Sequence, residues 1–262
     1  MNYVITHKYI DLNKKIIGDE RQYYKTLHVG TLDLEFKYDL YDNVGKNISD
    51  KNPYYCELTG LYWLWKNNIV PNDNIIGICH YRRYFTTKWR DFLYNYFNIM
   101  PTVISYKKVK SLLTSYQIVV PKKLRTIRTV RQLYDEYHDK NDLDILEDIL
   151  IERYPEYIKS FHHVMNEHKS LYGNMFVTYK YIFDKYCEWL FDVLAEVEKR
   201  TDVKNRDLYQ QRLYGFLSER LLQIWIEKNR YAIKEVSVFN TDGRKQNIIE
   251  KNLNRIRKLV NK

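Results

Sequence analysis

The residues best suited to chemistry form one short cluster, His80, Tyr81, Arg82 and Arg83, directly after the apolar run 75–79. The run is rich in β-branched residues and bounded by turn formers, which predicts a buried strand of a parallel sheet. Open α/β sheets bind ligands at the carboxyl ends of such strands. The guanidinium groups of Arg82 and Arg83 offer fixed, bidentate, permanently charged donors, which suit a diphosphate. The alternative is a solvated basic turn.

Two acidic residues could act as a general base. Glu219 lies in a predicted helix over residues 212–227, where it is either the ion-pair partner of an arginine or a proton acceptor. Asp142 lies among helical segments of residues 129–153, where helix capping or a solvated position competes with that role. Asp142 and Asp144 have the spacing of an Asp-x-Asp metal motif, but residues i and i+2 of a helix face different directions. We therefore predict no metal site, and a divalent metal (Mn²⁺ or Mg²⁺) stays the alternative to the two arginines.

Hydrophobic periodicity indicates the elements that must position these residues. Asn52 and Pro53 open a predicted helix over residues 54–67, since proline fits the first turn of a helix. Further helices are expected at 107–115, 129–153, 155–166, 182–199 and 212–227, and further strands at 3–6, 117–120, 171–177 and, as an edge strand, 236–239. Residues 11–45 look polar and irregular, and residues 89–106 look like a mobile lid or acceptor loop. Lys122 and Lys123 provide a second cationic strand end.

Length and composition point to a globular chain. With 262 residues, 45% of them hydrophobic, it can bury a sizeable core. It contains no run of eighteen apolar residues and no secretory signal at its start, so we expect a cytoplasmic protein. The three cysteines, Cys56, Cys79 and Cys187, lack zinc spacing and are expected to be reduced packing residues.

The net charge of +10 is concentrated in the C-terminal segment. Residues 244–262 hold seven Lys or Arg and one acid, Glu250, and thus +6 of the total. The apolar residues of this segment have helical spacing, which predicts a basic amphipathic helix. Through residues 245–262 such a helix suits peripheral contact with an anionic membrane on the inner face of the plasma membrane, and the alternative is docking on the domain. No nucleic-acid recognition motif is present, so we predict no nucleic-acid partner.

Eight ordered motifs resemble a bacterial family. They are VITHK (4–8), D-x-x-G-x-NIS (42–49), KNP-x-YCELT (51–59), LYW-x-WKN (61–67), HYRRYF (80–85), GNMF (173–176), YCEWLF (186–191) and QR-x-x-GF-x-SERL (211–221). Together they resemble the DUF4422 glycosyltransferases of capsular polysaccharide and exopolysaccharide loci. The resemblance implies an α/β fold of GT-A type, with a Rossmann-like mixed, mostly parallel sheet flanked by helices and a helical C-terminal part. It implies one domain over residues 1–243, with a nucleotide-sugar half at about 1–125 and an acceptor half at about 126–243.

The residue types and the resemblance together suggest roles for individual residues. Those assigned to the donor are Thr6, His7, Lys8, Asp42, Asn47, Glu57, Thr59, His80 and Tyr81. Those assigned to catalysis are Arg82, Arg83, Asp142 and Glu219, and those assigned to the acceptor are His138, Asn174 and Arg212. Several have plainer interpretations. A lone loop aspartate such as Asp42 is often an Asx-turn former, and a first-turn glutamate such as Glu57 often only complements the helix dipole.

Two functions of different classes follow. The first is transfer of a sugar from a nucleoside diphosphate donor, UDP above all, to a lipid-linked or oligosaccharide acceptor for capsule, exopolysaccharide or O-antigen. Galactofuranose is one donor used by relatives in the family. The alternative is a non-catalytic protein that binds nucleic acid or an anionic glycan through the same basic groove. No oligomeric state follows from the sequence.

Overall fold

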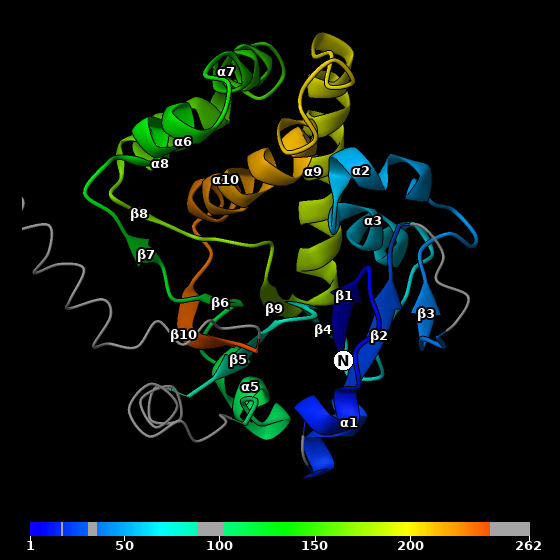
Figure 1. The fold of residues 1–262 in the computed structure, drawn as a ribbon. Helices are drawn as coiled ribbons and strands as arrows, with labels where there is room; N and C mark the ends of the chain where they lie inside the picture. The colour runs from blue at the N-terminus through cyan, green and yellow to red at the C-terminus, as the bar shows by residue number, and fades with distance from the viewer. Residues whose placement is uncertain (17, 31–35, 88–101, 242–262) are drawn as a thin grey trace, which may run out of the picture.

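The computed structural model describes residues 1–16, 18–30, 36–87 and 102–241, which form a mixed α/β fold (Figure 1). Its main sheet has eight strands in the described residues: β1 (Asn2–Thr6), β2 (Tyr24–His28), β3 (Leu40–Tyr41), β4 (Ile75–His80), β5 (Arg83–Thr86), β6 (Ile118–Pro121), β9 (Phe176–Tyr179) and β10 (Ile233–Asn240). Two further short strands, β7 (Leu124–Arg125) and β8 (Lys169–Ser170), form a separate antiparallel pair.

The main sheet is mixed and partly antiparallel. Strands β1 to β4 run parallel to one another, with Thr6 paired to His28 and Ile5 to His80. Strand β10 runs parallel to β6, whereas β9 is antiparallel to β4 and β6, and β5 is antiparallel to β10. The carboxyl ends of β1, β2 and β4 therefore meet at one edge. Alternation along β1 fills a core on each face, since Ile5 joins one apolar cluster and Val4 the other.

Helices cover the sheet and continue above its edge. They are α1 (Leu12–Lys15), α2 (Asn52–Tyr55), α3 (Leu58–Lys66), α5 (Tyr106–Leu113), α6 (Val130–Tyr137), α7 (Asn141–Arg153), α8 (Ile158–Asn166), α9 (Lys180–Arg200) and α10 (Leu213–Lys228), with 3-10 turns η1 (Gly18–Tyr23), η2 (Ser49–Lys51), η3 (Pro155–Tyr157) and η4 (Gln210–Arg212). The long α9 packs against α3, α7 and α10 (Figure 1). Its apolar stripe, which includes the fully buried Phe183 and Leu190, explains this central position. Helix α6 begins with a complete capping box of Thr129 and Gln132.

The structure corrects four details predicted from the sequence. The helix expected over residues 54–67 is interrupted at Cys56, whose φ is 52°. Residues 11–45 are not irregular, since they contain β2 and β3. Strand β2 buries polar residues such as Thr26 and His28, which hide the apolar pattern expected of a strand. The final strand is longer than expected and lies between β5 and β6, so it is not an edge. The strand expected at 171–177 begins only at Phe176, since the preceding residues form a loop.

Two other expectations concern the surroundings of the protein. No helix among the described residues is long and apolar enough to cross a bilayer. The basic helix expected at 244–262 lies outside the described residues, as does most of the loop expected at 89–106. The three cysteines are free thiols, with Cys79 and Cys187 buried and Cys56 partly exposed.

Candidate active site

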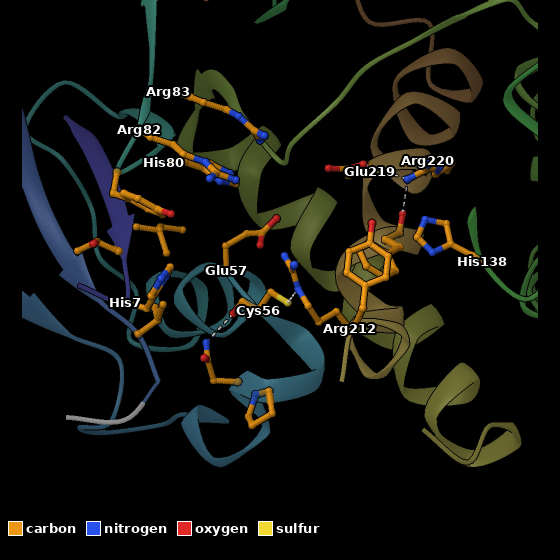
Figure 2. Close-up of a pocket in the computed structure, with 18 of the residues that line it drawn as sticks. His7, Cys56, Glu57, His80, Arg82, Arg83, His138, Arg212, Glu219 and Arg220 are labelled. Carbon is orange, nitrogen blue, oxygen red and sulfur yellow. Dashed lines mark hydrogen bonds and ion pairs between the residues drawn. The ribbon is translucent and has the colours of Figure 1, made fainter. Parts of the chain in front are cut away.

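A pocket of about 810 Å³ lies at the edge where the carboxyl ends of β1 and β4 meet. One wall comes from those strand ends and the β4–β5 turn, and the floor comes from the junction of α2 and α3. Helix α6, the η4 turn and α10 supply the opposite wall (Figure 2). Its charged and ionisable lining residues are His7, Cys56, Glu57, His80, Tyr81, Arg82, Arg83, Tyr137, His138, Tyr209, Arg212, Glu219 and Arg220. The pocket therefore combines strand-end cations with residues from the distant C-terminal half.

Arg82 and Arg83 form the cationic wall. Arg82 lies in the tight β4–β5 turn and Arg83 begins β5, and Figure 2 shows both side chains beside His80. Neither guanidinium forms an ion pair with any residue that the structure describes. Gly173, with φ of +63°, allows the loop before β9 to pass close by, since a Cβ atom there would lie 2.9 Å from Nη1 of Arg83. The wall thus presents two cationic groups that no carboxylate of the described chain binds in an ion pair.

Two histidines lie in the same wall. His7 directly follows β1, and His80 is the last residue of β4. Burial is the main cause that lowers the pKa of His7, and the nearby charges of Lys8, Arg212 and Arg82 lower it further. Burial also lowers the pKa of His80, assisted by Arg83 and Arg82 and opposed by Glu57. Both imidazoles are therefore biased toward the neutral form at neutral pH. Nε2 of His80 is buried and has no hydrogen-bond partner among the described residues.

Two carboxylates face the cavity. Glu57 lies just before α3, where Nδ2 of Asn174 donates to its Oε1 at 2.7 Å. Glu219 of α10 accepts from the backbone N–H of Gly173 at 2.8 Å and from Nη1 of Arg220 at 2.9 Å. Burial raises the pKa of Glu219 despite the opposing charge of Arg220. A carboxylate held in place with a raised pKa can accept a proton from a bound hydroxyl near neutral pH.

The wall formed by α6, η4 and α10 is aromatic. His138 stacks on Tyr209 at 5.9 Å between ring centroids and lies 4.1 Å from the ring of Phe216. Tyr137 and Tyr209 are 58% and 53% exposed, so their rings are open to a ligand. Nδ1 of His138 lies 3.1 Å from Gln210 Oε1, which fixes the imidazole ring. Aromatic rings with polar edges suit the apolar faces and hydroxyls of a sugar.

Arg212 and Cys56 connect the two sides of the pocket. Nε of Arg212 donates to Sγ of Cys56 at 3.2 Å, and the guanidinium also lies 5.5 Å from the Phe216 ring. Figure 2 shows Glu57 between His80 and Arg212. Arg212, which the sequence assigned to the acceptor, therefore lies where it can contact a ligand from either wall.

The pocket includes ten of the sixteen residues predicted from the sequence: Thr6, His7, Glu57, His80, Tyr81, Arg82, Arg83, His138, Arg212 and Glu219. Lys8 lies beside it, with Nζ 4.5 Å from the centre of the Tyr81 ring. Asn47 does not line it, because its side chain accepts from the backbone N–H and hydroxyl of Ser49 and donates to Gly45. Thr59 is fully buried and donates to the carbonyl oxygen of Cys56.

Asp42, Asp142 and Asn174 are also buried outside the lining. Asp42 is 1% exposed, and burial raises its pKa to about 6 although Thr59 hydrogen-bonds to it. Both carboxylate oxygens of Asp142 accept from Arg206, at 2.7 and 2.8 Å, and the residue does not line the pocket, so its assignment as a base stays a prediction that this geometry does not favour. Asn174 is buried, donates to Glu57 and Ser218 and thereby holds the carboxylate of Glu57, so its contact with a sugar stays a prediction.

Several lining residues were not assigned to the site from the sequence. The sequence analysis interprets Cys56 as a packing residue and gives no site role to Tyr209, Phe216 or Arg220. For the last three, the spacing with Arg212 and Glu219 around one turn and helix was the available signal. The second cationic strand end does not join the first, because Lys122 is exposed and Lys123 lies at a separate small pocket. Within the described part of the chain, no cluster of three His, Cys, Asp or Glu could hold a metal ion.

Comparison with known proteins identifies the family. The model of the family described as "Domain of unknown function (DUF4422)" matches residues 2–230. The chain belongs to the DUF4422 family. Among solved structures, the apo structure of the bifunctional glycosyltransferase WbbM is similar, with a TM-score of 0.76 and 27% sequence identity. The match covers 92% of this chain and 45% of the WbbM chain, so this DUF4422 protein spans less than half of that enzyme. No curated protein matches the chain.

Proposed function

We propose that this DUF4422 protein is a glycosyltransferase of GT-A type that uses a nucleoside diphosphate sugar, with UDP as the nucleotide. The observation that carries the proposal is the position of the Arg82 and Arg83 guanidinium groups. They lie at the carboxyl edge of the sheet in a pocket with two carboxylates and form no ion pair with the residues that the structure describes. The similarity to WbbM, named as a bifunctional glycosyltransferase, supports the same class.

In the proposed reaction, a hydroxyl oxygen of the acceptor forms a bond to the anomeric carbon as the bond from that carbon to the diphosphate oxygen breaks. Glu219 takes the proton of the hydroxyl, since its raised pKa suits a general base. The departing nucleoside diphosphate carries the negative charge, which Arg82 and Arg83 offset. Glu57 lies between the two walls and orients the donor sugar.

The donor occupies the strand-end wall. Thr6, His7, His80 and Tyr81 line it, and neutral imidazoles there can hydrogen-bond to the ribose or phosphate without repelling the arginines. Lys8 at the margin adds a further cation for the phosphates. Asp42 and Thr59 support this wall from below rather than through direct contact.

The acceptor occupies the aromatic wall. Tyr137, His138, Tyr209 and Phe216 offer stacking faces, and Arg212 provides a donor to sugar hydroxyls or to an anionic group. We propose that the acceptor is a growing lipid-linked or oligosaccharide glycan of a bacterial surface polysaccharide. The structural similarity to WbbM, a glycosyltransferase, supports a glycan acceptor. Galactofuranose is the donor sugar to test first.

The charge of the leaving group is balanced by arginine in this proposal rather than by Mn²⁺ or Mg²⁺. Fixed guanidinium groups bind diphosphate in a bidentate manner without any change in protonation. Addition of EDTA should therefore leave UDP affinity unchanged. A loss of affinity that Mn²⁺ restores would refute the cation-free site.

A thermal-shift panel tests the function. UDP and other nucleoside diphosphates, a DNA oligonucleotide and a sulfated glycan are added separately to the protein, and the unfolding temperature is measured. We expect UDP to raise it and DNA to leave it unchanged, because ligand binding to the folded state alone stabilises that state. Stabilisation by DNA or the glycan without any effect of UDP would instead favour a non-catalytic binding protein. Release of UDP from candidate UDP-sugars in the presence of glycan acceptors then identifies the donor.

A further inference from the structure

Strands β7 and β8 form a small antiparallel pair apart from the main sheet, beside α6 and α8 (Figure 1), although α6, α7 and α8 lie between them in the chain. Residues 122–128 and 168–170 are called the β7–β8 surface below. Leu124 pairs with Ser170 and Arg125 with Lys169, and the backbone N–H of Thr126 donates to the carbonyl of His168 at 2.9 Å. The chain then turns through Ile127 and enters α6. The β7–β8 surface is thus joined directly to α6, a helix of the candidate active site, while neither strand belongs to the main sheet.

The β7–β8 surface combines cations with exposed apolar side chains. Residues 122–128, KKLRTIR, contain four Lys or Arg and no acid. Ile127 is 97% exposed, the highest value among the exposed large hydrophobic residues of the described chain, and Leu124 is 51% exposed. Arg125 and, across the pair, Lys169 are also exposed. An isoleucine held at a turn with almost all of its surface in water has no packing role in the folded chain.

Acidic neighbours neutralise only part of this charge. Arg128 forms an ion pair with Glu136 of α6. Glu235 of β10 accepts from the backbone N–H of Lys123 at 3.2 Å. Arg125 and Lys169 form no ion pair with any residue in the described ranges. Arg125 and Lys169 therefore carry positive charge that no ion pair within the described ranges balances, on the same surface as the exposed Leu124 and Ile127.

We propose that the β7–β8 surface, residues 122–128 and 168–170, forms a contact surface for an anionic lipid bilayer. Anionic lipid headgroups attract the cations, and apolar side chains between those cations enter the boundary between headgroups and acyl chains. Nucleic acid is the other polyanion that such charge could bind. The observations favour the bilayer. The exposed side chain of Ile127 can enter the apolar part of a membrane, whereas the phosphate backbone of a nucleic acid offers no apolar surface to receive it.

Helix α6 connects the β7–β8 surface to the acceptor wall of the pocket. Ile127 precedes α6 by three residues, and Leu133, Tyr137 and His138 at and after that helix line the pocket. The helix has eight residues and is therefore about 12 Å long. If the proposed function holds, a lipid-linked acceptor could reach the pocket while its lipid stays in the bilayer.

Vesicle sedimentation of the full chain tests the contact without any nucleotide or sugar. Binding is measured to vesicles of phosphatidylcholine alone and of equimolar phosphatidylcholine and phosphatidylglycerol. The charge variant is Arg125→Gln with Lys169→Gln, and the apolar variant is Leu124→Ser with Ile127→Ser. The matched controls are Lys107→Gln with Lys108→Gln on exposed positions of α5, and Ile151→Ser, which is 52% exposed on α7.

We expect the unmodified chain to prefer the anionic vesicles. The charge variant should weaken that binding by roughly 25-fold, since each cation near an anionic surface contributes about fivefold. The apolar variant should weaken it by about tenfold while the dependence on salt persists. Controls should bind as the unmodified chain does. Unmodified unfolding temperatures and UDP shifts would show that the variants are folded, and they separate this proposal from the proposed function.

Three results would overturn the proposal. The chain could fail to bind anionic vesicles at all. The charge variant and the apolar variant could bind vesicles as tightly as the controls, which would assign membrane contact to the basic segment 245–262 or to another surface. The charge variant could lose affinity for a DNA oligonucleotide while vesicle binding stays the same, which would make the β7–β8 surface a nucleic-acid contact.

Discussion

Replacement of Arg82 and Arg83 by alanine is the most direct test of how the pocket binds a diphosphate. Both side chains line the pocket, and neither is paired with a carboxylate of the described chain. Their truncation removes cation–π contacts with Tyr81 and Tyr172 but leaves no carboxylate without an ion-pair partner. We expect Arg82→Ala and Arg83→Ala to weaken UDP binding and to leave the fold intact.

The size of the effect follows from the state of the two guanidinium groups. A hydrogen bond to a charged group contributes roughly 1.5–3 kcal/mol. Both residues are half-buried and the pocket is open to water, so the lower value applies to each. Each single variant should then lose about tenfold in affinity and the double variant about 100-fold. Because the two residues are adjacent, their effects need not be strictly additive.

Isothermal titration with UDP measures these affinities without any acceptor. Arg220→Ala is a control within the same pocket, because Glu219 already balances the charge of Arg220 at 2.9 Å. Its effect on UDP should stay below threefold. Arg200→Ala, which affects only a surface pair with Glu152, is the control outside the pocket. If Arg220→Ala weakened UDP as much as the Arg82 and Arg83 variants, the assignment of the diphosphate to the strand-end wall would be wrong.

Three further outcomes test other parts of the structure. Glu219→Gln should lower kcat for nucleotide release by roughly 10²–10⁴-fold with little change in KM for the donor. In the unmodified enzyme kcat should fall as pH drops through the raised pKa of Glu219, and the variant should lack this dependence. Folded Asp42 holds its proton more tightly than the unfolded chain does, so stability should decline by about 3 kcal/mol as pH rises from 3.8 to about 6. Asp42→Asn should remove this decline in thermal unfolding measured across that range, and an unchanged pH profile would contradict the assignment. Asp142→Ala leaves the guanidinium of Arg206 without its partner, so chemical denaturation should show a loss of roughly 3–5 kcal/mol, while UDP affinity measured on the folded variant stays unchanged.

The strands and helices with clear apolar patterns could be predicted from the sequence. The buried β4 and the amphipathic α9 lie within two residues of their expected ranges at each end. Strand β2 could not be predicted, because Thr26 and His28 look like loop residues and become strand residues only through burial beside β1. Strand β10 was misplaced at an edge, since nothing local in a sequence specifies which strands pair with it.

The same limit applies to the site. The strand-end residues Arg82 and Arg83 could be found because the rule for parallel sheets needs only local pattern and chain direction. Asp142 could not be judged that way. Its bidentate partner Arg206 is distant in the chain, so the carboxylate looked free in the sequence although the fold occupies both its oxygens. The aromatic wall likewise depends on the packing of α6 against the turn before α10, which no local motif records.

The broken helix at Cys56 shows how the fold departs from local preference to build the pocket. A continuous helix over residues 54–67 would satisfy the periodicity, yet Cys56 adopts a φ of 52°, which costs free energy in a residue other than glycine. The break separates α2 from α3 and places Cys56 and Glu57 at the pocket floor, where Arg212 contacts the thiol and Asn174 holds the carboxylate. Without the break, the backbone at Glu57 would continue the helix that begins at Asn52. The free-energy cost of the Cys56 conformation is thus offset by contacts from η4 and from the loop before β9, which join the two walls around the proposed reacting groups.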